Sequence, residues 1–127
     1  MPPAASPSSP PLRIVVGDNS IVTLTEADNG ATVILRPGQT ISVVLGGHSF
    51  ISWHAPRAAG ATLRLISSSG GYPGNKPALA RFRAARPGRT AISSVTDAAC
   101  LHAQPACEIP QQLWQVSVTV RAGSAGQ

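Results

Sequence analysis

Apolar and polar residues alternate at period two along most of the chain, in short runs that end at Gly, Pro, Asn or Asp. This alternation predicts β-strands with one buried and one solvated face. The clearest run is LWQVSVTVR at 113–121, where polar residues occupy every second position. Its predicted inward-facing residues are Trp114, Val116, Val118 and Val120.

Similar runs recur every 8–15 residues, and no stretch of ten residues carries a helical stripe. They lie at 20–25, 31–36, 39–45, 49–53, 62–67, 79–85 and 90–96. Turn formers separate them, such as ADNG at 27–30 and Pro37-Gly38. Many short strands with no helices predict an all-β chain that folds as an antiparallel β-sandwich of about 7–9 strands.

Face assignments follow from the same parity. The segment 79–85 directs Ala80, Phe82 and Ala84 inward and leaves Arg81 and Arg83 exposed. We expect Trp53 and Trp114 to anchor the core.

The segment 90–96 is ambiguous, because Ile92 and Val95 fall on opposite parities. A β-bulge is one way to reconcile them.

Composition favours a single exported domain. The 127 residues are 43% hydrophobic but only 12% charged, with 12 Gly and 12 Pro. The opening MPPAASPSSPP lacks the apolar region of a signal peptide and predicts a flexible stalk over 1–12. We expect a globular domain at 13–122, a flexible tail at 123–127, and a secreted or envelope-anchored protein whose natural export signal is absent from this sequence. No stretch is apolar enough to span a membrane.

The net charge of +5 raises the question of an anionic partner, either nucleic acid or an envelope polymer. The basic residues are spread along the chain, with one concentration between Lys76 and Arg89. No recognition helix, zinc finger or aromatic motif accompanies them. We therefore expect no specific nucleic-acid binding.

The only two cysteines bracket CLHAQPAC, at Cys100 and Cys107. They form a disulfide, a metal site or two free thiols. A metal would need further ligands, such as His102 with His48 or His54, and the C-x-H-x4-C spacing matches no standard structural zinc site. A disulfide is the favoured interpretation, and it would contribute about 2.5 kcal/mol. It would stiffen the loop more than the whole fold.

Catalytic chemistry is not predicted. His48 and Ser49 are adjacent, so a strand would point them to opposite faces, and no Gly-x-Ser-x-Gly elbow is present. The five carboxylates, Asp97 among them, suggest no facing pair. The Gly-rich segment at 69–76 lacks the spacing of a P-loop. We expect neither an enzyme nor a cofactor or metal.

Several motifs occur in a familiar order: GQTISVVL (38–45), SFISW (49–53), ARFRAARPGRTAIS (80–93) and LWQVSVTV (113–120). Over residues 20–122 the chain resembles the chagasin family of cysteine-protease inhibitors. The resemblance implies an immunoglobulin-like sandwich that blocks papain-type proteases with three loops at one end. It also implies a protein partner, and we expect a monomer.

The resemblance assigns those loops to 46–50, 69–75 and 100–107. The family carries an Asn-Pro-Thr-Thr-Gly-Tyr type of motif in the first loop and Arg-Pro-Trp in the third, where this chain has GGHSF and CLHAQPAC. The assigned binding residues are Gly46, Gly47, His48, Ser49, Phe50, Gly70, Gly71, Tyr72, Leu101, His102, Ala103 and Gln104.

A second hypothesis remains beside inhibition. The chain would be a non-inhibitory envelope domain that binds an anionic surface or a partner protein. The contact would then involve the strand face with Arg81 and Arg83, together with Arg86 and Arg89. Such binding should weaken as salt screens it.

Overall fold

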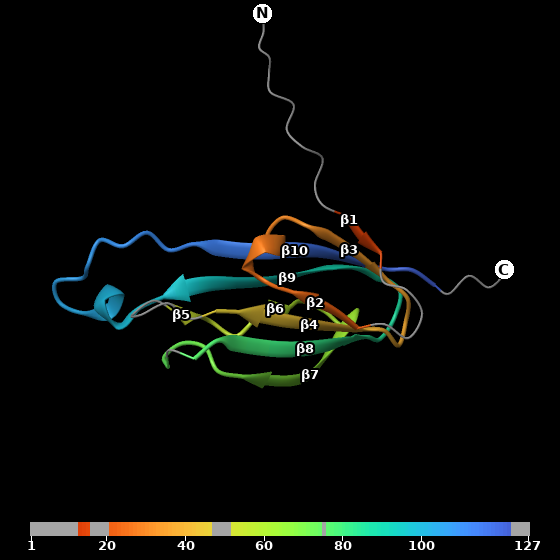
Figure 1. Ribbon diagram of the computed structural model, residues 1–127, viewed down its shortest axis with the longest axis horizontal. Helices are drawn as coiled ribbons and strands as arrows, with labels where there is room; N and C mark the ends of the chain where they lie inside the picture. Colours follow the sequence, from red (N-terminus) through yellow and green to blue (C-terminus); the bar gives the residue numbers. More distant parts are fainter. Residues whose placement is uncertain (1–12, 16–20, 47–51, 75, 123–127) are drawn as a thin grey trace, which may run out of the picture.

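The computed structural model describes residues 13–15, 21–46, 52–74 and 76–122, and it confirms the predicted immunoglobulin-like β-sandwich (Figure 1). Two 3-10 helices, η1 (Glu26–Asp28) and η2 (Ala99–His102), interrupt the strands. The strands are β1 (Arg13–Val15), β2 (Ile21–Leu24), β3 (Thr32–Leu35), β4 (Thr40–Leu45), β5 (Ser52–Trp53), β6 (Arg57–Ala58), β7 (Leu63–Ser69), β8 (Ala78–Ala84), β9 (Gly88–Asp97) and β10 (Leu113–Val120).

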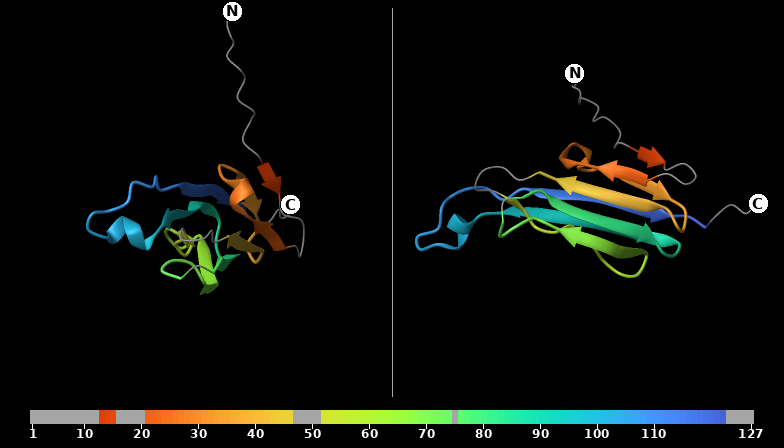
Figure 2. Two further views of the ribbon diagram at one scale, coloured as in Figure 1. Left: turned by 60° about the vertical axis from the view of Figure 1, so that its left-hand side comes forward. Right: turned by 60° about the horizontal axis from the view of Figure 1, so that its bottom comes forward.

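The strands form two stacked sheets, which Figure 2 shows from two further sides. One sheet has the order β1-β3-β10-β9-β5, with β6 also paired to β9, and the other has the order β2-β4-β8-β7. Five of the described strand pairs are antiparallel, as expected. Three pairs, β1–β3, β3–β10 and β2–β4, are parallel. The pairing is therefore mixed. Strands β1 and β3 belong to one sheet and β2 and β4 to the other, and the two strands of each pair run in the same direction.

The predicted alternation fills the space between the sheets. Strand β8 buries Ala78, Ala80, Phe82 and Ala84 and exposes the residues between them. Strands β4 and β10 follow the same pattern. Trp53 and Trp114 are buried, as predicted, and the indole Nε1 of Trp114 donates to the Thr25 carbonyl (3.0 Å).

The bulge considered for segment 90–96 does not occur. Strand β9 pairs with β10 in continuous register from Val95 to Gly88. The buried positions after Ile92 are the polar Ser94 and Thr96, which explains the misleading parity of Val95. Both hydroxyls are hydrogen-bonded: Ser94 Oγ donates to the His54 carbonyl (2.6 Å), and Thr96 Oγ1 accepts from Gln112 N (2.8 Å).

A bulge does occur on the edge strand β7, between Leu65 and Ser67, opposite the uninterrupted strand β8. Bulges on edge strands twist the edge away from further strand pairing.

Strand register brings the ends of three loops to one end of the sandwich. Leu45, where β4 ends, pairs with Ala78, where β8 begins. Ser52, where β5 begins, pairs with Asp97, where β9 ends. The segments 46–51, 70–77 and 98–112 therefore all connect strands at this end. We call it the loop end. The segment around η2 projects there beyond the strands (Figure 1).

Within the described residues, no helix has the length and apolar character needed to cross a membrane.

The packing of Trp114 predicts a large loss of stability on truncation. Trp114→Ala should lower the free energy of unfolding by about 3–5 kcal/mol, because a large buried side chain would leave a cavity. Urea unfolding would measure this change. The control is Leu113→Ala, since Leu113 is 59% exposed on the opposite face of the same strand, and should cost under about 0.5 kcal/mol. Equal losses in the two variants would contradict the assigned faces.

Candidate functional site

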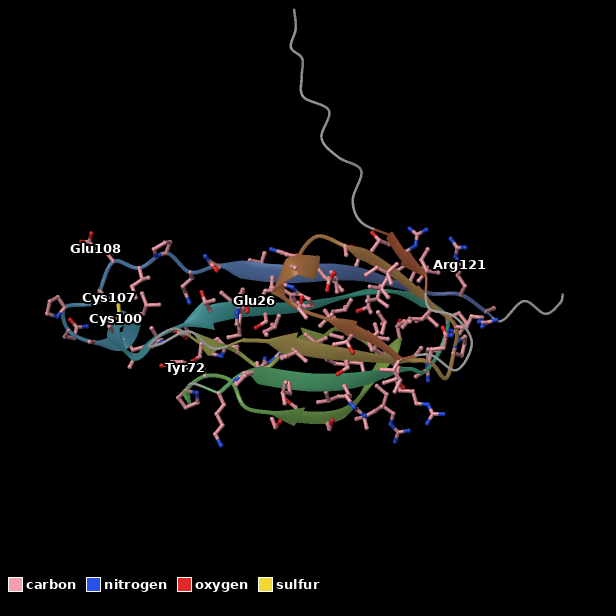
Figure 3. All side chains as sticks on the ribbon, viewed as in Figure 1. Glu26, Tyr72, Cys100, Cys107, Glu108 and Arg121 are labelled. Atoms are coloured by element: carbon pink, nitrogen blue, oxygen red, sulfur yellow. A yellow bond between two sulfur atoms is a disulfide. The ribbon has the colours of Figure 1, made fainter. Side chains whose placement is uncertain are left out.

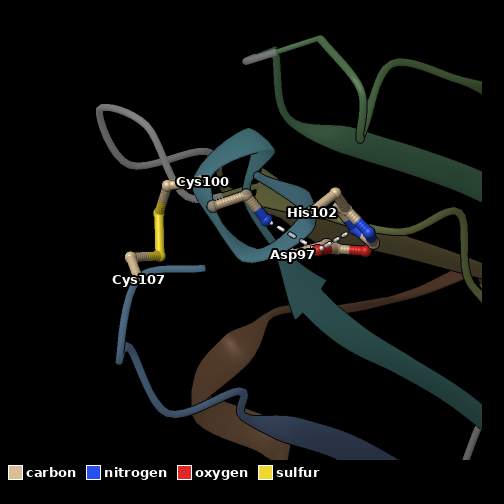
Figure 4. The surroundings of a disulfide bond; sticks show 5 residues. Asp97, Cys100, His102 and Cys107 are labelled. Carbon is tan, nitrogen blue, oxygen red and sulfur yellow. Dashed lines mark hydrogen bonds and ion pairs between the residues drawn. A yellow bond between two sulfur atoms is a disulfide. The ribbon is translucent and has the colours of Figure 1, made fainter. Parts of the chain in front are cut away.

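The carboxylate of Asp97 joins two parts of the loop end. Asp97 is the last residue of β9, and its side chain is only 8% exposed. One oxygen, Oδ2, lies 2.9 Å from His54 Nε2. The other, Oδ1, lies 2.8 Å from His102 Nε2 (Figure 4) and accepts a hydrogen bond from Ala98 N (2.8 Å).

These contacts keep the carboxylate ionised. Burial alone would raise the pKa of Asp97. The hydrogen bonds from His54, Ala98 and His102, together with the charge of His102, outweigh burial and hold this pKa below its ordinary value of 3.8. The ionised side chain of Asp97 therefore links His54, which follows β5, to His102, which ends η2. We call this link the Asp97 tie.

The ring of Tyr72 lies against both histidines. Its centroid is 5.0 Å from that of His54 and 5.9 Å from that of His102, and both ring pairs are tilted. Tyr72 N donates to the Trp53 carbonyl (2.8 Å), so loop 70–77 is also fixed to β5. The three side chains come from three separate segments, and they form one half-exposed surface, the His54–Tyr72–His102 cluster.

The glycine pair in the second loop has a structural role. Gly70 and Gly71 have φ angles of +73° and +84°, a region that favours glycine. A Cβ on Gly70 would collide with the Pro77 carbonyl, and one on Gly71 would lie 2.7 Å from the Trp53 carbonyl oxygen. Both glycines thus allow the loop to close on itself and on β5.

The predicted disulfide between Cys100 and Cys107 is confirmed, with a Cα–Cα distance of 5.3 Å (Figure 4). Cys107 N also donates to the Cys100 carbonyl (2.9 Å). The bridge closes the segment that carries His102, whose imidazole is anchored on Asp97. In the ranges that the structure describes, no group of three or more His, Cys, Asp or Glu side chains is arranged to hold a metal ion.

The structure places the predicted binding residues as follows. Tyr72 and His102 are in ring contact, while Leu101 is half-buried and Ala103 and Gln104 are exposed on the disulfide loop. Gly46 lies at the same end, where its N–H donates to Glu26 Oε2 (3.0 Å). The other first-loop candidates lie outside the described residues: Gly47, His48, Ser49 and Phe50.

Two residues of the site were not predicted in this role. His54 was considered only as a metal ligand, and Asp97 only as a carboxylate without a partner. A usable signal was present, since each directly follows a predicted strand, 49–53 or 90–96, and strand ends cluster at the rims of sheets.

An open recess of about 510 Å³ lies beside the cluster. It is lined by His54, Ala55, Arg57, Tyr72, Ser93, Ser94, Val95 and Leu113. Each imidazole directs one ring nitrogen to Asp97, and in the described part of the chain no hydroxyl or thiol is hydrogen-bonded to either ring. The arrangement provides a stiff contact surface with an adjoining hollow, and no activated nucleophile is present among these residues.

Replacing Asp97 tests the tie. Asp97→Asn should cost about 1–3 kcal/mol near neutral pH, because charge-assisted hydrogen bonds are lost. A carboxyl whose folded pKa is lowered stabilises the fold above its unfolded pKa, and this stability is lost as pH falls through the folded pKa. The difference in the free energy of unfolding between wild type and Asp97→Asn, measured with urea, should therefore become smaller below about pH 4.

The matched control for Asp97→Asn is Glu108→Gln, which removes an exposed carboxylate beside the disulfide. Glu108→Gln should leave the free energy of unfolding nearly unchanged both near neutral pH and below about pH 4. If the loss of stability in Asp97→Asn did not depend on pH, this result would contradict an ionised Asp97 that is hydrogen-bonded in the folded protein.

The disulfide predicts a simple mass result. The native protein should have the mass of the dithiol form less two hydrogen atoms, and it should resist alkylation until it is reduced. Intact-mass spectrometry with and without reductant measures both. Double alkylation of the unreduced native protein would contradict the bridge.

No protein-family model matches the sequence, and no curated protein matches it. Solved structures do match the fold. One is the cysteine protease inhibitor EhICP2 from Entamoeba histolytica, at 17% identity and a TM-score of 0.59, over 89% of this chain and all of that one. Another is the solution structure of amebosin, at 16% identity and a TM-score of 0.52, over 81% of this chain and all of that one.

At these identities the likeness concerns the fold. It confirms the predicted resemblance at that level: the two-sheet architecture around this site is similar to that of a known cysteine protease inhibitor across the full length of that inhibitor.

Proposed function

We propose that this protein is an exported, monomeric inhibitor that inserts its loop end into the cleft of papain-type cysteine proteases. The observation that carries the proposal is the tie at that end, in which Asp97 and Tyr72 hold two of the three expected inhibitory loops together. The fold likeness to a cysteine protease inhibitor supports the same assignment.

Stiffness of the loops is what such an inhibitor needs. Loops that are ordered before binding lose less conformational entropy when they enter a cleft. In this chain the disulfide fixes the third loop, and the hydrogen bond from Tyr72 N to the Trp53 carbonyl fixes the second against β5. The loop end is therefore preorganised without the Arg-Pro-Trp motif of the family.

The side chains offered at this end suit a protein partner. Tyr72 has an apolar ring and a polar hydroxyl, a combination enriched in protein interfaces. Ala103 and Gln104 are exposed on the disulfide loop. The small side chain of Ala103 allows main-chain contacts with a cleft wall, and the Gln104 amide can donate and accept hydrogen bonds. We assign the second and third loops to the two walls of the protease cleft.

The disulfide also supports an oxidising location. Such bridges persist in secreted and envelope proteins and are rare in the cytosol. We therefore include a secreted or envelope-anchored location in the proposal.

Titration of papain tests the function. Papain is activated, freed of excess thiol so that the Cys100–Cys107 bridge stays closed, and assayed against rising concentrations of the oxidised protein. We expect tight inhibition with a one-to-one end point. Absence of inhibition at micromolar protein would overturn the proposal.

Variants locate the contact. Tyr72→Ala should weaken inhibition by at least about tenfold, in the range of an interface aromatic. Cys100→Ser with Cys107→Ser should weaken it through loss of preorganisation. Arg86→Ala, at the opposite end of the sandwich, is the control and should inhibit like wild type. Equal effects of Tyr72→Ala and Arg86→Ala would contradict binding through the loop end.

A further inference from the structure

The outer face of the four-stranded sheet concentrates positive charge. Arg64 on β7 pairs directly with Arg83 on β8, and Arg81 follows two residues away on the same face. Side chains at such positions have Cβ atoms about 5–8 Å apart. Like charges at this spacing repel one another, so the cluster costs stability unless an anion neutralises it.

No acidic side chain in the described ranges neutralises this cluster. Thr40 and Ser42 of β4 face Arg83 and Arg81, and Ser67 of β7 also faces Arg81. The described carboxylates lie elsewhere: Glu26 and Asp28 in η1, Asp97 in the site, and Glu108 beside the disulfide. In Figure 3, Glu108 lies at the end that carries Cys100 and Cys107, Glu26 lies nearer the middle of the molecule, and Arg121 lies toward the other end.

The same sheet also carries most of the exposed large apolar side chains. Of the five in the described residues, Leu113 alone belongs to the other sheet. The other four are Ile21 (55% exposed), Leu65 (54%), Ile66 (53%) and Leu79 (41%). Leu79 alternates with the buried residues of β8 and so lies on the same face as Arg81 and Arg83, and Ile21 pairs with Thr40, which faces Arg83. Leu65 pairs with the buried Phe82 and so lies on the other face of the sheet.

We propose that this face, with Arg64, Arg81 and Arg83 beside Ile21 and Leu79, docks on the surface of an anionic phospholipid bilayer. Guanidinium groups bind lipid phosphates, often in bidentate geometry. Exposed aliphatic side chains can enter the boundary between headgroups and acyl chains. Guanidinium groups and aliphatic side chains on one face of the sheet therefore match the phosphate layer and the acyl boundary of a bilayer surface.

A soluble polyanion accounts for less of the face. A polyphosphate or acidic polysaccharide would use the arginines and leave Ile21 and Leu79 exposed. Single-stranded nucleic acid would use aromatic platforms, yet the described aromatic residue of this sheet, Phe82, is only 2% exposed and points into the core. The lipid interface is separate from the loop end and goes beyond the proposed inhibition.

Vesicle binding tests the proposal. The oxidised protein is sedimented with vesicles of phosphatidylcholine alone and of equal parts phosphatidylcholine and phosphatidylglycerol. We expect binding only to the anionic vesicles, decreasing as salt rises from about 0.05 to about 0.5 M. R64Q/R81Q/R83Q should lower the partition coefficient on the order of 100-fold, at about fivefold per charge.

Two further variants separate position and chemistry from net charge. R57Q/R89Q/R121Q removes the same number of charges from exposed positions associated with the other sheet, and should lower binding less than about fivefold. R64K/R81K/R83K keeps the charges and should bind anionic vesicles within about tenfold of wild type. Circular dichroism and thermal unfolding confirm that each variant is folded.

I21S/L79S distinguishes a bilayer from a soluble polyanion. It should weaken vesicle binding while leaving binding to inorganic polyphosphate unchanged. Binding to polyphosphate without binding to vesicles would overturn the bilayer in favour of a polymer. Equal losses in the two Arg→Gln variants, or no vesicle binding at low salt, would overturn the docking face altogether.

Discussion

The loop end depends on a buried negative charge. A carboxylate that is removed from water is costly unless hydrogen-bond donors replace the lost solvation. Asp97 has three such donors, and they belong to His54, Ala98 and His102. Satisfying one side chain therefore fixes the strand end after β5 and the short helix η2 relative to β9. Tyr72 then packs on both imidazoles and brings in the second loop.

Other contacts reinforce this tie rather than replace it. The disulfide closes the far part of the third loop, whereas His102 anchors its near part. Ser52 Oγ donates to the Gly74 carbonyl (2.6 Å), which holds the second loop to the start of β5. The loop end thus combines covalent, charged and backbone restraints in neighbouring segments, and its shape follows from the chain's own contacts before any partner arrives.

Periodicity predicted those parts of the fold in which burial is decided by apolar side chains. Strands β4, β8 and β10 follow it closely, including the buried Trp114. It failed in β9, where Ser94 and Thr96 occupy inward positions because hydrogen bonds satisfy their hydroxyls. It also missed β1 and the two-residue β6, which are too short for a pattern. Periodicity could not predict the parallel pairing, because alternation indicates which face a residue occupies and not the direction of the strand.

The candidate site was predictable to a different extent. The resemblance assigned the second and third loops to one end, and Tyr72 and His102 of these segments are in ring contact. The tie through Asp97 and His54 could not be read from spacing, since those residues are 43 positions apart. Their contact depends on the pairing of Ser52 with Asp97, a long-range register that no local pattern encodes.

The likeness to EhICP2 at 17% identity indicates that this sandwich tolerates extensive sequence change. A β-sandwich constrains which positions are apolar more than which apolar residue fills them. Loop sequences are freer still, provided that each loop keeps its shape. Here a disulfide and a carboxylate tie provide that shape, so the absence of the family's loop motifs does not by itself leave the loops unordered.

The two surfaces that we assign are compatible in space. The loop end lies at one extremity of the long axis, whereas the Arg64–Arg81–Arg83 cluster lies on a sheet face that runs along that axis (Figure 1). A molecule lying on this face would direct its loops parallel to the supporting surface. The carboxylate of Glu108 would then lie at the loop end, whereas Arg83 and Arg64 lie beside Thr40, at the other end of β4. This separation of charge favours contact through the sheet, because an anionic surface attracts the arginines and repels the acidic end.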